Sequence, residues 1–548
     1  MILLDASAKI PSGIMTGNVN DLGDYYQCLS IDEFVNDWEI QGKYCAITIP
    51  LNQENPITIP QFPEFPEFPD IDIPWPPTTT EVPNPDTGEE DEETDEVRVA
   101  RQYEALRRYA MGISGLGEPV ENRISPMVIT QTSGSTLGIC VPKVCTATEA
   151  VDFLQNRIRF INITYNEFFC RLPNDKLFSP ADYIYAVVKV IFVFILDPKT
   201  ANTLYRCFSV YTNTRRFLTF NTVPGALECI DGIRAISMLW VVVGHTYSFT
   251  LMAYIHNMAD TVTWLTKFSS TWINSAPITV DTFFCLSGIL AVYTTVGKIS
   301  RGRFIRTIHL FYINRLLRMF PILAAVVLLQ ASLFNHFSDG PFWMNVSQQA
   351  QNCRTWWWSA LLHVQNYVNA VEICIPQTWY LSVDVQLYFF CPIIMVWLFG
   401  REMIAWLALC AIVVISLASS TAYSFVYDFS AALFNPARLS EFNEYTTIYY
   451  INTLTRAPPF FIGMIYGYLL HICRDKQLKI SKINVVLLWI LSFTMMAFCI
   501  FSIYPAMQLD HEGQLFDNFL NAYMRAIWAC ALGWLIFACV HGYGGTLY

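Results

Sequence analysis

The sequence predicts an all-α polytopic membrane helix bundle preceded by a disulfide-containing, mainly helical lumenal or extracellular domain. Hydrophobic residues make up 53% of the 548 residues and charged residues only 14%, against roughly 25% charged residues in an average soluble domain. Apolar runs long enough to cross a bilayer begin only after about residue 182, and the preceding part is polar and rich in turns. We therefore expect a domain outside the membrane followed by a multi-pass bundle.

The outer domain is predicted over residues 1–49 and 101–181, interrupted by an insertion over residues 50–100. The insertion contains PQFPEFPEFPDIDIPWPP and then DTGEEDEETDE, a composition that cannot bury enough apolar surface to offset chain entropy. We expect a disordered, solvated spacer. The net charge of −11 comes partly from this stretch, so no nucleic-acid partner is predicted.

Cysteines and a sequon indicate an oxidising compartment for the outer domain. Cysteines that cluster in a polar domain of a membrane protein are typical of disulfides. The segment GICVPKVC has no second cysteine pair or matching histidine that would complete a metal site. The disulfide candidates here are Cys28, Cys45, Cys140, Cys145 and Cys170, and Asn162 is a predicted glycosylation site.

The membrane part begins with residues 182–233, predicted as a short first membrane segment and a cytosolic linker, and continues as a membrane domain over 234–548. The first segment is shorter than a bilayer crossing needs and contains Lys189. Basic loops alternate with acidic ones, and the positive-inside rule places the basic loops in the cytosol. Spans are predicted near 183–196, 235–255, 278–297, 319–334, 379–399, 403–424, 458–473, 484–504 and 519–540.

The loop over 335–378 supports this orientation. It falls on the lumenal side and carries a sequon at Asn345 and the isolated pair Cys353 and Cys374, which we predict to form a disulfide. The protein is thus expected to be a multi-pass membrane protein with a lumenal or extracellular N-terminal domain. The plasma membrane and the endoplasmic reticulum both fit this chemistry.

Arg234 and His245 are the leading candidates for catalysis. They stand eleven positions apart in one apolar run, so on a helix they share a face about 16 Å apart. Ionisable groups at membrane depth usually face a bundle interior or a wet cavity, where they have a function. Arg234 alone is also explained as a marker of the cytosolic helix end, and His245 as a partner of a neighbouring helix.

Further charged residues are predicted near the cytosolic and lumenal ends of the bundle. Arg315 and Arg318, spaced i, i+3, can lie along one side of a helix near an anionic donor, and the positive-inside pattern explains them equally well. Asp281 and Asp384 are placed near lumenal helix starts, where either could orient the imidazole of His245 or favour a helix N-terminus.

Motifs of several other enzyme classes are missing from the sequence. No histidine belongs to an HxxxH-type pattern, and there is no GxSxG elbow, P-loop or Rossmann glycine run. No metal site, nucleotide hydrolysis or dehydrogenase activity is predicted.

Segments in a characteristic order resemble the membrane acyltransferase 3 family. They are CIDGIRAISMLWVVVGHTY, VDTFFCLSGIL, FYINRLLRMFP, TWYLSVDVQLYFFCP and RAPPFFIGMIYGYLL. The N-terminal SGIMTGNVNDLGDYYQCL and GICVPKVC resemble the extracellular domain of the animal branch, the nose resistant to fluoxetine (NRF) proteins. The resemblance covers nearly the whole chain except the insertion.

This resemblance implies O-acyl transfer from acyl-CoA to a hydroxyl of a lipid or small molecule, with no bound cofactor. The family's Arg-X10-His motif falls on Arg234 and His245, with His245 as the general base. Arg315 and Arg318 would neutralise donor phosphates together with Arg234. The remaining site candidates are Asp384 as a third catalytic residue and Asp281, Ser287 and Trp379 as substrate-binding residues.

A carrier function is the alternative to catalysis. In this reading the same bundle transports or takes up a lipid or xenobiotic, and Arg234 and His245 are ligand contacts. The predicted partners are membrane lipids, acyl-CoA and a hydroxyl acceptor whose identity the sequence does not give. The chain starts MILLDASAKIPSG and ends GYGGTLY, so by resemblance to the family we expect a membrane domain truncated at its C-terminus.

Overall fold

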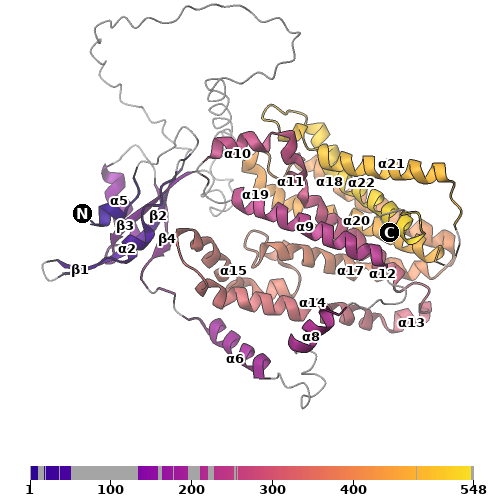
Figure 1. The fold of residues 1–548 in the computed structure, drawn as a ribbon, viewed down its shortest axis with the longest axis horizontal. Helices are drawn as coiled ribbons and strands as arrows, with labels where there is room; N and C mark the ends of the chain where they lie inside the picture. The colour runs from indigo at the N-terminus through magenta and orange to yellow at the C-terminus, as the bar shows by residue number, and fades with distance from the viewer. Residues whose placement is uncertain are drawn as a thin grey trace, which may run out of the picture.

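A computed structural model describes residues 2–9, 18, 20–35, 38–50, 134–157, 163–173, 175–176, 178–194, 210–219, 227–251, 255, 257–474, 476 and 478–544. A small N-terminal domain lies at one end of a long helix bundle (Figure 1). The predicted fold class, a helical membrane bundle preceded by a domain with disulfides, is confirmed. Residues 51–100 of the insertion and Asn162 lie outside the described residues.

The N-terminal domain contains a four-stranded antiparallel sheet, so the expectation that this domain is mainly helical needs correction for its described residues. Strand β2 (Trp38–Pro50) pairs with β1 (Asp32–Val35), β3 (Gly134–Pro142) and β4 (Thr164–Arg171). The pairing of β2 with β3 bridges the insertion, so no local sequence pattern reveals it. The described helices of this domain are α1 (Ile2–Ala6), α2 (Tyr25–Leu29) and α5 (Ala147–Arg157).

Two disulfides tie the sheet together. Cys28–Cys140 joins α2 to β3, and Cys45–Cys170 joins β2 to β4 at directly opposed positions. The prediction that Cys145 forms a disulfide needs correction, because this cysteine is unpaired and half-buried. It lies in the turn that follows β3, beyond the sheet in which the other four cysteines meet.

Seven helical segments among the described residues are long and apolar enough to cross a membrane. This is fewer than the spans predicted. Helix α6 (Pro180–Phe194) is a short first segment, as predicted, and α20 (Thr453–Ile472) is excluded by its lower hydropathy. The other long helices are α9 (Glu228–Leu251), α12 (Thr279–Tyr293), α14 (Ile308–Ala331), α17 (Trp379–Leu398), α18 (Glu402–Tyr427), α21 (Lys482–Phe501) and α22 (Gln514–Val540).

Shorter helices fill the connections of the bundle. They cap its ends and position the segments that border the pocket described below. They are α8 (Val210–Phe217), α10 (Met258–Leu265), α11 (Thr271–Asn274), α13 (Arg301–Arg306), α15 (Met344–Leu361), α16 (Gln365–Val368) and α19 (Phe442–Glu444), with a π-helical turn over Tyr445–Tyr450.

Helix α20 occupies the core, and glycines let α12 approach it in backbone contact. A Cβ atom on Gly463 would lie 2.2 Å from the carbonyl oxygen of Cys285, and one on Gly288 would lie 2.0 Å from that of Phe460. Real side chains cannot adopt such distances. Small residues of this kind allow close helix packing in membranes, where helix association depends on van der Waals contact.

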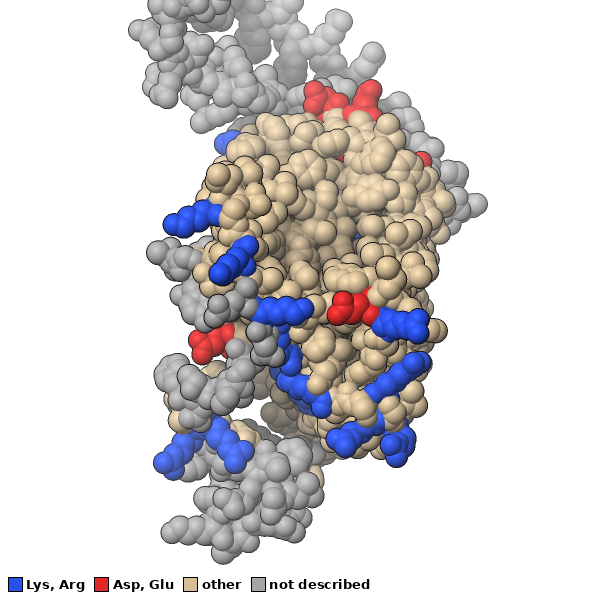
Figure 2. All heavy atoms as spheres, turned by 90° about the vertical axis from the view of Figure 1, so that its right-hand side faces the viewer, with Lys and Arg blue, Asp and Glu red and all other residues tan. Residues whose placement is uncertain are grey.

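The bundle has two chemically different ends. Figure 2 looks onto the end where α12 finishes and α21 begins, and lysine and arginine side chains gather there. We call it the basic end; the opposite end, where α9 and α14 finish and α12 and α17 begin, is the N-domain end (Figure 1). The exposed basic residues of the connecting segments are Lys298, Arg301, Arg303, Arg306, Lys476, Lys479 and Lys482.

The N-terminal domain contacts the loop after α14 through one aspartate. The hydroxyl of Tyr25 donates a hydrogen bond to Asp339 at 2.9 Å. Arg171 and Lys176 approach the same carboxylate at 3.4 and 3.5 Å. These contacts fix the domain against the segment that leads directly into α15.

Replacing Gly463 by alanine is expected to destabilise the bundle by about 1–3 kcal/mol, because the new methyl group must push α12 away. Thermal unfolding of the purified chain in detergent measures the effect. Gly302→Ala is the matched control, since a Cβ there meets no atom within 4 Å. Equal melting temperatures for the two variants would contradict the close contact.

Candidate active site

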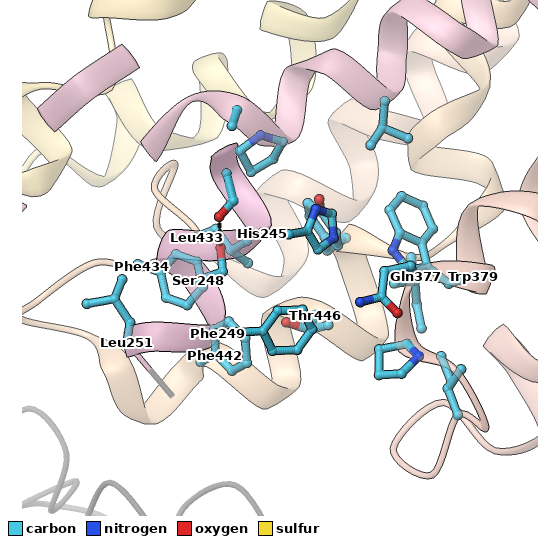
Figure 3. A pocket seen from close by; sticks show the side chains of 18 of the residues that line it. His245, Ser248, Phe249, Leu251, Gln377, Trp379, Leu433, Phe434, Phe442 and Thr446 are labelled. Carbon is cyan, nitrogen blue, oxygen red and sulfur yellow. Dashed lines mark hydrogen bonds between the residues drawn. The ribbon is translucent and has the colours of Figure 1, made fainter. Parts of the chain in front are cut away.

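A pocket of about 420 Å³ opens at the N-domain end of the bundle. Its walls come from the last turns of α9, the start of α12, helix α15, residues 370–379 and residues 433–451. His245 projects into it from α9, close to Ser248 and Phe249 (Figure 3). Among the described residues that line the pocket there is no lysine, arginine, aspartate or glutamate.

The imidazole of His245 is oriented by its own helix. Its Nδ1 lies 2.9 Å from the carbonyl oxygen of Val241, one turn earlier. A carbonyl only accepts hydrogen bonds, so Nδ1 carries the proton and Nε2 keeps a free lone pair. The expectation that Asp281 or Asp384 orients this ring needs correction, because both carboxylates bind arginines instead.

Arg234 lies on the same continuous helix, toward the basic end. Eleven residues separate it from His245 within α9, which corresponds to about 16 Å along the axis. Its Nη1 donates to Asp231 at 3.3 Å, and its side chain is 38% exposed. The guanidinium therefore remains accessible to an incoming anion.

Arg315 points into the bundle and joins three helices. Its Nη2 donates to Asp384 on α17 and, at 3.0 Å, to Ser287 on α12. Its guanidinium carbon lies 4.1 Å from the ring centre of Tyr388. Arg318 is instead exposed. The expectation that both arginines contact donor phosphates stays a prediction; Arg315 would have to exchange its ion pair with Asp384 for such a contact, and Arg318 would not.

A second charged cluster lies behind the pocket wall. Arg456 contacts both carboxylate oxygens of Asp281 at 3.0 and 2.9 Å, and Arg525 approaches Asp281 at 3.9 Å. The guanidinium carbon of Arg456 lies 5.3 Å from the ring centre of Trp379 and 4.3 Å from that of Tyr450. Both rings line the pocket, so they separate this cluster from it.

The sequence analysis missed Arg456 and Arg525 as members of this cluster. Each stands in an apolar run, RAPPFFIG and NAYMRAIWAC. A single cation within such a run is the signal that could have found them, because it requires a buried partner. Asp281, which had been considered as a partner of His245, is that partner.

His363 is another buried group near the ion pair of Arg315 with Asp384. It is 3% exposed, and neither ring nitrogen has a hydrogen-bond partner among the described residues. Burial lowers the pKa of His363 below its ordinary value, against the opposing attraction of the Asp384 carboxylate. The ring is therefore neutral at pH 7 and adds no charge beside Asp384.

The predicted pair Cys353 and Cys374 forms a disulfide with a Cα–Cα distance of 4.2 Å. It joins α15 to the segment before α17, next to the lining residues Asn352 and Ile373. The bond thus holds two walls of the pocket together. Asn345, a predicted glycosylation site, is the second residue of α15.

No cluster of three or more histidine, cysteine, aspartate or glutamate residues that could hold a metal ion occurs in the part of the chain that the structure describes.

Comparisons with known proteins match both parts of the chain. The model of the acyltransferase domain matches residues 227–545, and that of the N-terminal domain of nose resistant-to-fluoxetine protein matches residues 1–154. Nose resistant to fluoxetine protein 6 of Caenorhabditis elegans is 24% identical over 606 residues, covering 100% of this chain and 68% of that protein. Regulator of hypoxia-inducible factor 1 of the same nematode is 26% identical over 205 residues, 35% of this chain and 38% of that protein. No solved structure matches.

The helix bundle and the matched domain define a multi-pass membrane protein of the acyltransferase class. The chain belongs to the membrane acyltransferase 3 family, in its nose resistant to fluoxetine branch. The resemblance predicted from the sequence motifs is thereby confirmed.

Replacing Asp281 by asparagine is expected to destabilise the bundle by about 3–5 kcal/mol, because two buried arginines lose their counter-charge. Thermal unfolding in detergent measures this loss. Asp231→Asn is the matched control, because the side chain of Asp231 is 80% exposed. An Asp281 variant as stable as the control would refute the role of the cluster.

Proposed function

We propose that this protein transfers an acyl group from acyl-CoA to a hydroxyl group of a lipid or small-molecule acceptor, with His245 as the general base. One observation carries the proposal: a histidine with a free Nε2 lines a pocket, and the helix that bears it continues to Arg234 near the basic end. Membership of an acyltransferase family supplies the reaction class.

The reaction follows from the groups present. Nε2 of His245 takes the proton of the acceptor hydroxyl while the hydroxyl oxygen attacks the thioester carbonyl. The carbon–sulfur bond then breaks, the acyl group remains on the acceptor oxygen, and the departing CoA thiolate receives the proton from the imidazolium. No net charge is created, and the Nδ1 hydrogen bond to Val241 holds the same tautomer for the next cycle.

The donor is proposed to enter at the basic end. The exposed lysines and arginines there suit the phosphates of CoA, and the positive-inside rule favours a cytosolic location for this end. The N-terminal domain and the mouth of the pocket would then face the lumen or the cell exterior. Arg234 lies on α9 between the basic end and His245, where we expect it to contact the donor's phosphates.

His245→Ala is expected to lower acyl-CoA turnover by about 100-fold or more, because general base catalysis is lost. Arg234→Ala is expected to raise the KM for acyl-CoA more than it lowers kcat, because it removes a phosphate contact. Release of free CoA by membranes containing matched amounts of each variant measures both effects.

His309→Ala is the control, since this imidazole is exposed at the start of α14. No turnover by the wild type, or equal turnover by all variants, would reject the enzyme. Uptake of a labelled lipid into vesicles that His245→Ala lowers, without any release of CoA, would then favour the alternative, a carrier in which His245 contacts the ligand.

A further inference from the structure

The pocket beside His245 has two different ends. Figure 3 shows Phe249, Leu251, Phe434 and Phe442 on one side of His245, and Gln377 with Trp379 on the other. The first side is apolar and aromatic, which suits a hydrocarbon group. The reactive imidazole lies between the two ends.

Four carboxamides line the pocket from two segments, and we call this group the carboxamide end: Gln348, Gln349 and Asn352 on α15, and Gln377 in the segment that precedes α17. Gln348 donates a hydrogen bond to Asn352 at 3.0 Å, and Asn274 and Asn443 line other parts of the pocket. The disulfide Cys353–Cys374 holds these two segments together. Each carboxamide both donates and accepts hydrogen bonds, so the group suits hydroxyl or amide functions of a ligand.

Charged side chains do not occur among the described residues that line the pocket. The cluster of Asp281 with Arg456 and Arg525 lies behind the lining residues Trp379 and Tyr450, and Arg456 is only 1% exposed. A ligand charge would lose its hydration in a pocket that offers no charged side chain in return.

We infer that the acceptor is an uncharged amphiphile, with a hydrocarbon group at the aromatic end and a neutral polyol or amide head at the carboxamide end. The hydroxyl that receives the acyl group lies at the junction, where His245 can reach it. That the bound amphiphile is the acceptor rests on the proposed function. The preference of the pocket for an uncharged amphiphile rests on the lining residues alone.

Binding of matched probes tests the inference directly. The full chain is placed in lipid nanodiscs, and calorimetric titrations use octyl glucoside, octyl glucuronide and 1-octanol below their aggregation limits, with empty nanodiscs as the blank. Octyl glucoside is expected to bind about tenfold tighter than octyl glucuronide, whose carboxylate must be desolvated. Equal or tighter binding of the glucuronide would overturn the inference in favour of an anionic ligand drawn by Arg456.

Variants of the carboxamide end separate its role from general folding. Gln377→Leu and Gln349→Leu, in two different segments that line the pocket, are each expected to weaken octyl glucoside binding by about tenfold while leaving 1-octanol binding unchanged. Gln351→Leu is the matched control, because Gln351 is exposed on α15 and does not line the pocket. Unchanged glucoside binding in both pocket variants would refute the carboxamide role.

The same titrations distinguish this inference from the proposed reaction. His245→Ala should retain glucoside binding and lose turnover. If the wild type binds octyl glucoside through Gln377 but releases no CoA with any acceptor, the reaction is wrong and the binding preference stands. If CoA is released but charged and neutral acceptors serve equally, the reaction stands and the binding preference is wrong.

Discussion

Charges buried in an apolar bundle need partners, and this constraint organises the membrane domain. Helix α12 supplies Asp281, which binds Arg456 on α20 and approaches Arg525 on α22. Further along the same helix, Ser287 accepts a hydrogen bond from Arg315 of α14, which also forms an ion pair with Asp384 of α17. Removing one member leaves an unpaired charge in low dielectric, so these contacts specify one arrangement of five helices.

The same pairing prepares the pocket. Because the arginines and carboxylates satisfy one another behind Trp379 and Tyr450, the cavity beside His245 is lined by neutral groups. The buried charges of Asp281 and Arg456 thus lie behind two aromatic residues that line the pocket.

Contacts also lead from the N-terminal domain toward the pocket. Tyr25, Arg171 and Lys176 hold Asp339, and the chain then enters α15, which carries three of the carboxamides that line the pocket. The Cys353–Cys374 bond connects α15 to the segment before α17, which also lines the pocket. The N-terminal domain is therefore connected to the carboxamide end through Asp339 and α15.

The sequence alone determined the class of fold, the N-terminal disulfide chemistry and the joint placement of Arg234 and His245 on one helix, because hydropathy, cysteine context and helical period are local properties. The family followed from the resemblance of the sequence motifs. The sequence did not determine the partners of Asp281 and Asp384, or that Arg315 is paired while Arg318 is exposed. Nor did it determine the pairing of β2 with β3 or the unpaired state of Cys145. Each of these depends on which distant segments meet. Only tertiary packing decides such contacts, since a side chain's polarity shows that it needs a partner but not which partner it finds.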